Sequence, residues 1–204
     1  MRSDHIGHLT LAGREALVAY GVTTVIDLRS PAELIRMPNP FADGSGPAYI
    51  NVPLIDDANM RELGDAADMY ERYLMILETR QQAFGGVFNA VAEADGALVF
   101  HCFAGKDRTG LVAAMLLALA GVSKDAIVAD FAETDRQLAK KYEQWIADSA
   151  PERRRSMRDE LRCPPEWILG VLDRLDQKWG GVEGYLESSG VSATNIDRVS
   201  TKLA

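Results

Sequence analysis

The sequence has 204 residues, of which 47% are hydrophobic and 25% charged, and its formal net charge is −8 at pH 7. These values are typical of one globular domain, here residues 1–204, and they exclude a disordered or fibrous chain. The acidic balance argues against nucleic acid as a partner, because binding to a phosphate backbone requires a basic surface. No apolar run reaches the length of a membrane span, and the polar N-terminus leads into no signal segment. We therefore expect a cytoplasmic protein without integral membrane association.

Residues 10–20 place apolar side chains at helical spacing, so a short helix is expected there. Residues 22–28 are β-branched and mostly apolar, as in a strand that is buried on both faces. Ser30-Pro31-Ala32-Glu33 combines an N-cap residue, a proline at the first helical position and an acidic first turn, so a short helix is expected there. After a turn-rich loop over 38–47, residues 48–52 are expected to form a second strand.

Residues 65–94 are rich in helix-forming residues, and Gly85-Gly86 is expected to divide them into two helices. A strand, a polar loop and a buried helix should follow at 97–101, 102–108 and 111–119. From residue 123 onward the sequence predicts helices. This order predicts a single α/β domain in which a short, mostly parallel central sheet is flanked by helices.

Two cysteines, Cys102 and Cys163, are too few for a disulfide framework and lack the paired spacing of a zinc site. His5 and His8 have no further ligands nearby in the sequence, so neither a metal nor another cofactor is expected. A cysteine that directly follows a histidine, as Cys102 follows His101, instead suggests a catalytic nucleophile.

Residues 101–110 read HCFAGKDRTG and separate Cys102 from Arg108 by five residues. A loop of this length between a strand and a helix can turn its backbone N–H groups toward one point, which creates an anion site at the helix N-terminus. The cysteine sulfur would lie beneath that point, and the guanidinium would hold two phosphate oxygens. The expected substrate-binding residues are Phe103, Ala104, Gly105, Lys106, Asp107 and Arg108.

The same positive field would stabilise the thiolate form of Cys102, and Arg108 would offset the charge of the phosphoryl group during attack. We expect His101 to orient Cys102 by bonding the loop backbone, without acting as a base. Thr109 follows the arginine directly and could donate its hydroxyl to the sulfur. The same residues leave two alternatives open, namely a catalytically silent phosphate-binding module and a different thiolate enzyme such as a sulfurtransferase or arsenate reductase.

The segment HCFAGKDRTG resembles the signature loop of the bacterial tyrosine phosphatase family, within the protein tyrosine phosphatase superfamily. The resemblance extends over nearly the whole chain through the following segments: Arg2-Ser3-Asp4, residues 21–30, residues 121–131 and residues 184–191. It implies a phosphatase-like α/β fold and the hydrolysis of phosphomonoesters through a phosphocysteine.

The resemblance also implies a general acid after the second visible strand, where Asp56 matches best and Asp57 is a close competitor. Asp107 in the signature loop could instead orient Arg108 or share the acid role. Lys106 is expected to add a second cation at the rim of the pocket, a feature that accompanies phosphoinositide substrates in related phosphatases. The expected partners are therefore phosphorylated proteins or phosphoinositides.

Members of this family usually carry a glycine-rich stretch before an Arg-Ser pair, which here is Arg2-Ser3 at the start of the chain. The resemblance therefore implies that this family segment is missing and that one edge of the sheet lacks a neighbouring strand. We expect that edge to be covered by C-terminal helices or by a second copy in a homodimer.

Overall fold

The computed structural model describes residues 1–203. In this range four parallel strands form one sheet in the order β1-β4-β2-β3, which confirms the predicted parallel α/β fold. The strands are β1 (Arg2–Ser3), β2 (Val22–Asp27), β3 (Ala48–Asn51) and β4 (Ala97–His101). The sequence did not predict β1, because two residues are too short to carry a periodic pattern.

The two central strands, β2 and β4, are buried on both faces. Ile26 pairs with Phe100 in register, and both side chains join the larger hydrophobic core. The neighbouring pair, Val25 and Val99, joins a smaller core on the opposite face. This alternation explains why both strands are continuously apolar in sequence.

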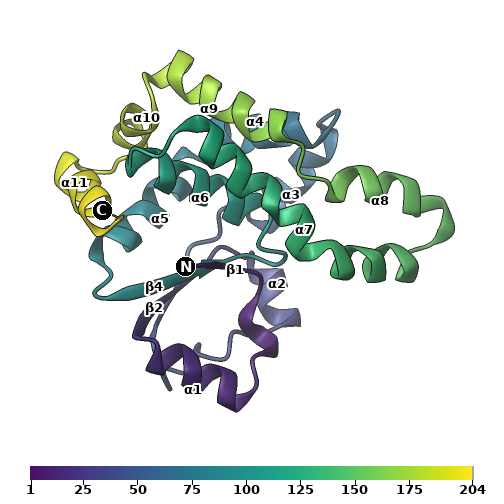
Figure 1. Ribbon diagram of the computed structural model, residues 1–204, viewed down its shortest axis with the longest axis horizontal. Helices are drawn as coiled ribbons and strands as arrows, with labels where there is room; N and C mark the ends of the chain where they lie inside the picture. The colour runs from purple at the N-terminus through teal and green to yellow at the C-terminus, as the bar shows by residue number, and fades with distance from the viewer. Residues whose placement is uncertain (204) are drawn as a thin grey trace.

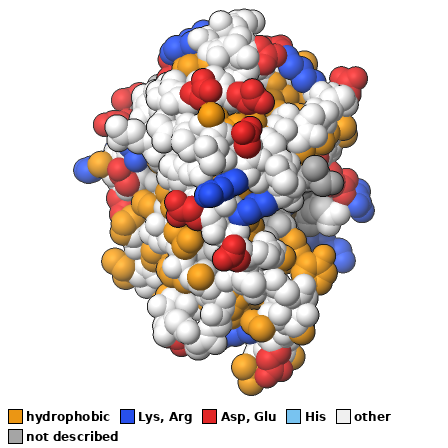
Figure 2. Space-filling model, turned by 90° about the vertical axis from the view of Figure 1, so that its left-hand side faces the viewer, with side chains coloured by type: hydrophobic (Ala, Val, Ile, Leu, Met, Phe, Trp, Pro, Cys, Tyr) orange, Lys and Arg blue, Asp and Glu red, His pale blue; other side chains and the backbone are white. Residues whose placement is uncertain are grey.

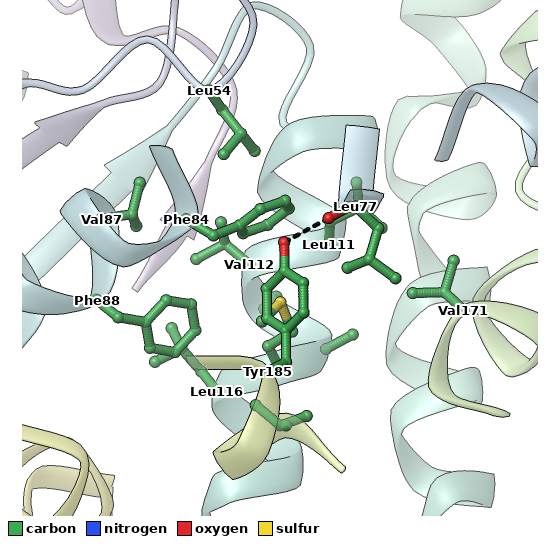
Figure 3. Packing of buried hydrophobic residues seen from close by; sticks show 14 of the residues in the cluster. Leu54, Leu77, Phe84, Val87, Phe88, Leu111, Val112, Leu116, Val171 and Tyr185 are labelled. Atoms are coloured by element: carbon green, nitrogen blue, oxygen red, sulfur yellow. Dashed lines mark hydrogen bonds between the residues drawn. The ribbon is translucent and has the colours of Figure 1, made fainter. Parts of the chain in front are cut away.

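Most helices cover the face of the sheet that carries the larger core, as Figure 1 shows. They are α4 (Met69–Thr79), α5 (Gln81–Glu93), α6 (Asp107–Leu119), α7 (Lys124–Asp148), α9 (Pro165–Trp179), α10 (Val182–Ser188) and α11 (Ala193–Leu203), whereas α8 (Arg154–Leu161) lies to the side of the sheet and buries no residue. Tyr185 lies in the middle of this core, and its hydroxyl donates a hydrogen bond of 2.7 Å to the carbonyl of Leu77 (Figure 3). The buried phenol is therefore satisfied inside an otherwise apolar layer.

The opposite face of the sheet is covered more thinly, by α1 (Leu11–Ala19) and a short 3₁₀ turn (Ile6–His8) (Figure 1). Two further short helices, α2 (Pro31–Arg36) and α3 (Asp57–Glu62), follow the carboxyl ends of β2 and β3. The start of α2 is the one predicted, with Ser30 as N-cap, whereas α3 was not predicted. Neither short helix buries a hydrophobic residue, so hydrophobic spacing could not reveal α3.

The prediction that Gly85-Gly86 divides residues 65–94 is wrong, because α5 runs through both glycines. The break lies instead at Arg80, between α4 and α5. A Cβ atom at Gly85 would lie 2.1 Å from the carbonyl oxygen of Ser189. Gly85 is therefore needed for close packing against the C-terminal helices, and the helical hydrogen bonds continue through it.

The edge strand β1 lies beside α7, because Arg2 donates hydrogen bonds to Asp130 (2.6 Å) and Thr134 (3.0 Å) of that helix. These contacts do not test the expected homodimer at the sheet edge, which stays a prediction.

On the face of the molecule in Figure 2, acidic, basic and hydrophobic side chains are interspersed, so the net charge of −8 is not concentrated in one acidic patch there. Within residues 1–203, no helix combines the length and the apolar character that crossing a bilayer requires.

Candidate active site

The signature loop lies at the carboxyl end of the parallel sheet, between β4 and α6. β4 ends at His101 as predicted, but α6 begins at Asp107, so the loop covers residues 102–106 and Arg108 lies in the first turn of the helix. The Cys102 side chain is buried, and its sulfur accepts a hydrogen bond of 3.3 Å from the backbone N–H of Gly105. The loop therefore turns back over the sulfur, and a backbone donor stabilises negative charge there.

Gly105 makes this turn possible. Its φ of +72° lies in the left-handed region, and a Cβ atom there would lie 2.6 Å from the carbonyl oxygen of Ser3. The N-terminal segment lies directly against the loop, since Arg2 donates to the carbonyl of Gly105 (3.1 Å) and the His5 N–H donates to the carbonyl of Phe103 (3.1 Å). Residues 2–5 therefore hold the loop in place from behind, a role that the sequence did not reveal.

His101 is fully buried and contacts the loop backbone, as expected. Its Nδ1 lies 3.1 Å from the carbonyl oxygen of Cys102, and its Nε2 lies 3.1 Å from the amide nitrogen of Asn39. Burial lowers the pKa of His101, which favours the neutral ring. Since the Asn39 amide is a donor, this network assigns the ring proton to Nδ1, where it is donated to the Cys102 carbonyl.

A buried ion pair supports the histidine from beneath. Arg29 binds Asp27 through Nη2 at 2.7 Å, and both side chains are fully buried. Burial alone would raise the pKa of Asp27, but the hydrogen bonds and charge of Arg29 outweigh it and the pKa is lowered. Asp27 also accepts a hydrogen bond of 3.2 Å from Asn39. The only signal in the sequence was the charged pair Asp27 and Arg29 at the end of an apolar strand.

Arg108 is paired with Glu33, a residue that the sequence analysis had placed only in a helix start. Its Nη1 and Nη2 donate to the two carboxylate oxygens of Glu33 at 2.6 and 2.7 Å. Among the described residues, Nε of Arg108 has no hydrogen-bond partner. Glu33 therefore binds the two terminal nitrogens of the guanidinium. The side of the guanidinium that carries Nε stays free for a second bidentate contact.

The electrostatics of this pair follow from its burial. Burial by itself would lower the pKa of Arg108. The hydrogen bond to Glu33 and the charges of Cys102, Glu33 and Asp107 have the opposite and larger effect, so the pKa is raised and the guanidinium stays charged. For Glu33 the effect of burial, which raises the pKa, is outweighed by Arg108, and the pKa is lowered. The carboxylate also accepts a hydrogen bond of 2.8 Å from the Ser30 N–H. The capping box of α2 therefore positions the carboxylate that holds Arg108.

The two aspartates at the start of α3 are engaged in structural contacts. Asp56 is the N-cap of α3, accepting from the Asn59 N–H at 2.8 Å, and it pairs with Arg80 at 3.3 Å. These contacts lower its pKa, the backbone hydrogen bond being the largest cause, and its side chain is 42% exposed. Asp57 accepts a hydrogen bond of 3.2 Å from the N–H of Ala32 in α2. Asp57 therefore connects α3 to α2, the helix that carries Glu33, the partner of Arg108.

Asp107 is held by Lys106 and Tyr73. The Lys106 amine lies 2.7 Å from its carboxylate, and the Tyr73 hydroxyl donates a short hydrogen bond to the same oxygen. Burial and the charge of Asp107 raise the pKa of Tyr73, so the phenol keeps its proton. Asp107 is 30% exposed and is therefore reachable from solvent.

The expectation that Lys106 lies at the rim of the pocket is wrong, because its side chain is only 2% exposed. Its amine is neutralised by Asp107 and also donates to the carbonyl of Glu160 at 2.8 Å. The amine further lies 5.7 Å above the ring of Trp167, a cation–π contact. Lys106 therefore connects the signature loop to the end of α8 and is not itself a free cation at the rim.

Phe103 directly follows Cys102 in sequence, and Thr109 directly follows Arg108. The Thr109 hydroxyl is buried and has no hydrogen-bond partner among the described residues, so it is available to a nearby acceptor. The Phe103 ring stacks between His5 (5.3 Å between centroids) and Trp145 (5.9 Å) and is 36% exposed. Its side chain therefore anchors the loop to α7, and only its backbone remains free to face an anion.

A cavity of about 360 Å³ opens over the loop, between α3 and α4 on one side and the end of α8 on the other. Its charged and polar lining consists of Arg72, Tyr73, Lys106, Asp107, Arg108 and Glu160, with Ala104 at its base. Neither Asp56 nor Asp57 lines it. Of the predicted loop residues, the cavity wall contains Ala104, Lys106, Asp107 and Arg108, whereas Cys102, Phe103 and Gly105 are not part of its lining.

The second cysteine, Cys163, is buried away from solvent. Burial is the largest cause of its raised pKa, which is about 12, so it is a neutral thiol at physiological pH. Among the described residues, no group of three or more His, Cys, Asp or Glu side chains is arranged to hold a metal ion. Of the two cysteines, Cys102 is the one whose sulfur accepts a hydrogen bond from the loop.

A buried thiol beneath a loop amide, beside a charged guanidinium at the carboxyl edge of a parallel sheet, defines an oxyanion-binding cysteine site. Comparison with known proteins gives the family. The model of the tyrosine phosphatase family matches residues 1–204. The chain therefore belongs to the tyrosine phosphatase family, and its enzyme class is that of a protein-tyrosine phosphatase.

Two relatives are similar over almost the whole chain. A tyrosine-protein phosphatase of Nostoc commune is 34% identical, over 100% of this chain and 73% of the relative. The triple specificity protein phosphatase PtpB of Mycobacterium tuberculosis is 30% identical, over 97% of this chain and 88% of the relative. The resemblance inferred from the signature loop is thereby confirmed.

Proposed function

We propose that this protein hydrolyses phosphomonoesters through a phosphocysteine formed on Cys102. The observation that carries the proposal is the placement of Cys102 directly after β4 and of Arg108 in the first turn of α6, where both carboxylate oxygens of Glu33 hold the guanidinium. The hydrogen bond from Gly105 to the sulfur supports it further. A charged clamp beside an anionic sulfur is what attack on a phosphate ester requires.

The reaction takes two steps. The Cys102 sulfur attacks phosphorus, an S–P bond forms, and the P–O bond to the leaving group breaks as that oxygen gains a proton. Water then attacks phosphorus, the S–P bond breaks, and inorganic phosphate leaves. Arg108 holds two equatorial oxygens through its free edge in both steps, and the unpartnered Thr109 hydroxyl donates to the sulfur as it departs. His101 holds the Cys102 carbonyl and orients the nucleophile.

We assign the proton transfer to Asp107. Of the three aspartates proposed from the sequence, Asp107 alone lines the cavity that Arg108 lines. Asp56 caps a helix and has a lowered pKa, which disfavours the protonated form that a general acid needs. Asp107 carries the proton before the first step and gives it to the leaving oxygen. The carboxylate that remains pairs with Lys106 and takes a proton from the attacking water in the second step. Asp56 remains the alternative acid.

Phosphotyrosine in a protein is the substrate that the cavity supports best, and phosphoinositides are the second class. Apolar side chains such as Ile55, Leu63 and Met69 line the cavity and suit an aromatic ring. A free Lys106 at the rim would favour phosphoinositides, whereas this amine is neutralised by Asp107. PtpB is named a triple specificity phosphatase. The proposal therefore includes more than one class of phosphorylated substrate.

The test is a substrate panel with a phosphotyrosine peptide, a phosphoserine peptide and a short-chain phosphoinositide, measured as phosphate release. We expect Cys102→Ser to abolish turnover on every substrate and Cys163→Ser, the matched control at a buried thiol outside the site, to retain it. Acid quenching of the wild type during turnover should give a phosphate adduct on the peptide that contains Cys102. Full turnover by Cys102→Ser would refute the mechanism, and phosphopeptide binding without turnover by the wild type would indicate a silent binding module.

A further inference from the structure

Arg72 is a cation on the wall of the catalytic cavity that the mechanism does not use. It belongs to α4 and lines the same cavity of about 360 Å³ as Arg108. Its Nε is buried and has no hydrogen-bond acceptor among the described residues. Its Nη1 contacts only the sulfur of Met69, at 3.6 Å, and a thioether is a weak acceptor. A buried N–H without a partner is costly, which points to an acceptor supplied by a ligand.

The other cations of this cavity are already neutralised. Lys106 pairs with Asp107 at 2.7 Å, and Arg108 pairs with Glu33 at 2.6 Å. In the part of the chain that the structure describes, Arg72 takes part in no ion pair. Glu160 also lines the cavity, but its carboxylate lies 3.8 Å from Arg153. Arg72 is therefore the uncompensated positive charge of the cavity.

We propose that Arg72 binds a second anionic group of the substrate, next to the phosphoryl group held by Arg108. The inference rests on the proposed phosphatase function and specifies its substrate class. The occupant we infer is a phosphotyrosine peptide with an Asp or Glu side chain adjacent to the phosphotyrosine.

The character of the remaining wall favours a peptide over an inositol polyphosphate. The cavity is lined by the apolar side chains of Ile55, Met60, Leu63, Met69, Ile76 and Leu161. Such a surface packs well against an aromatic ring, whereas a ring of hydroxyl groups would bury polar atoms without partners. Among the described residues, Arg72 is the one cation in the cavity lining without an ion pair, which matches one extra carboxylate.

The test compares two phosphotyrosine peptides that differ only in Asp and Glu against Asn and Gln at the positions flanking the phosphotyrosine. Binding is measured on the Cys102→Ser protein and kcat/KM on the active enzyme. We expect the acidic peptide to be favoured about tenfold, the gain from one added charge-assisted hydrogen bond. This preference should disappear in Arg72→Gln, persist partly in Arg72→Lys, and weaken as salt is raised.

Arg198→Gln is the matched control, because it removes one exposed arginine from α11, outside the cavity. It should leave the tenfold preference unchanged, which separates a local contact from a change in net charge. An equal preference in wild type and Arg72→Gln, with Arg72→Gln folded by circular dichroism, would overturn the proposal. Tighter binding of a soluble inositol polyphosphate than of the acidic peptide would also overturn it.

Failure of the proposed function gives a different result. If wild-type turnover is absent on every substrate, the hydrolytic mechanism fails, while the binding preference on the Cys102→Ser protein still decides the role of Arg72.

Discussion

The signature loop and the wall that faces it across the cavity are built in different ways. The loop joins β4 to α6, and both Cys102 and Arg108 are buried and held by hydrogen bonds from neighbouring segments. The facing wall comes from α3 and α4, and α3 buries no hydrophobic residue. The loop is thus embedded in the core, whereas part of the wall lies on the surface.

Under the proposed function, the residues that act on phosphorus and the residues that select the substrate lie in different parts of the fold. Groups that act on phosphorus must keep a fixed geometry, and the sheet and α6 supply it. Arg72, which we propose selects the substrate, lies on α4 but outside the hydrophobic core cluster, so its substitution leaves the buried residues of that helix in place. Substitutions in the loop should therefore weaken turnover of every substrate alike, whereas substitutions in the wall should change the order of preference.

The largest expected effect comes from Arg108→Lys, which keeps the charge and removes the fork. Lysine cannot bind the carboxylate of Glu33 and two phosphate oxygens at once, so we expect kcat/KM to fall by about 10³-fold. Steady-state kinetics on a phosphotyrosine peptide and on p-nitrophenyl phosphate should show the same loss. A loss confined to one of the two substrates would mean that the clamp contributes to selectivity, contrary to this comparison.

The next effect comes from Asp107→Asn, for which we expect a fall in kcat of about 10²-fold on phenyl phosphate. The fall should be much smaller on p-nitrophenyl phosphate, because its leaving group needs little protonation. Asp56→Asn is the matched control, since asparagine caps a helix as well as aspartate does and should change kcat by less than about threefold. The reverse pattern would assign the acid to Asp56.

A smaller effect is expected from Glu33→Gln, which weakens the ion pair that orients Arg108 and leaves Arg108 itself in place. We expect kcat/KM to fall by about tenfold, because Arg108 loses its fixed orientation. Since the pKa of Glu33 is lowered below its ordinary value of 4.5, its stabilising contribution is present above that pH and is lost as the pH falls through the folded value.

Urea unfolding at pH 7 and pH 3 measures this contribution. The wild type should be more stable than Glu33→Gln by roughly 2 kcal/mol at pH 7, and the difference should shrink at pH 3. An equal difference at both pH values would show that the charge of Glu33 does not stabilise the fold.

The sequence by itself determined the features that depend on local pattern. An apolar β-branched run predicted β2, a short apolar run predicted β4, and the spacing of Cys102 and Arg108 predicted the anion loop. Both signals are local because strand burial and loop curvature are set by residues close together in the chain.

Only the tertiary structure decided which distant residues complete the site. It placed Glu33 on Arg108 across 75 positions of sequence, buried Lys106 instead of exposing it, and left Arg72 without a partner beside the clamp. The charge of a side chain is written in the sequence, but its compensation depends on which carboxylate the folded chain brings within hydrogen-bond distance. No local pattern carries that information.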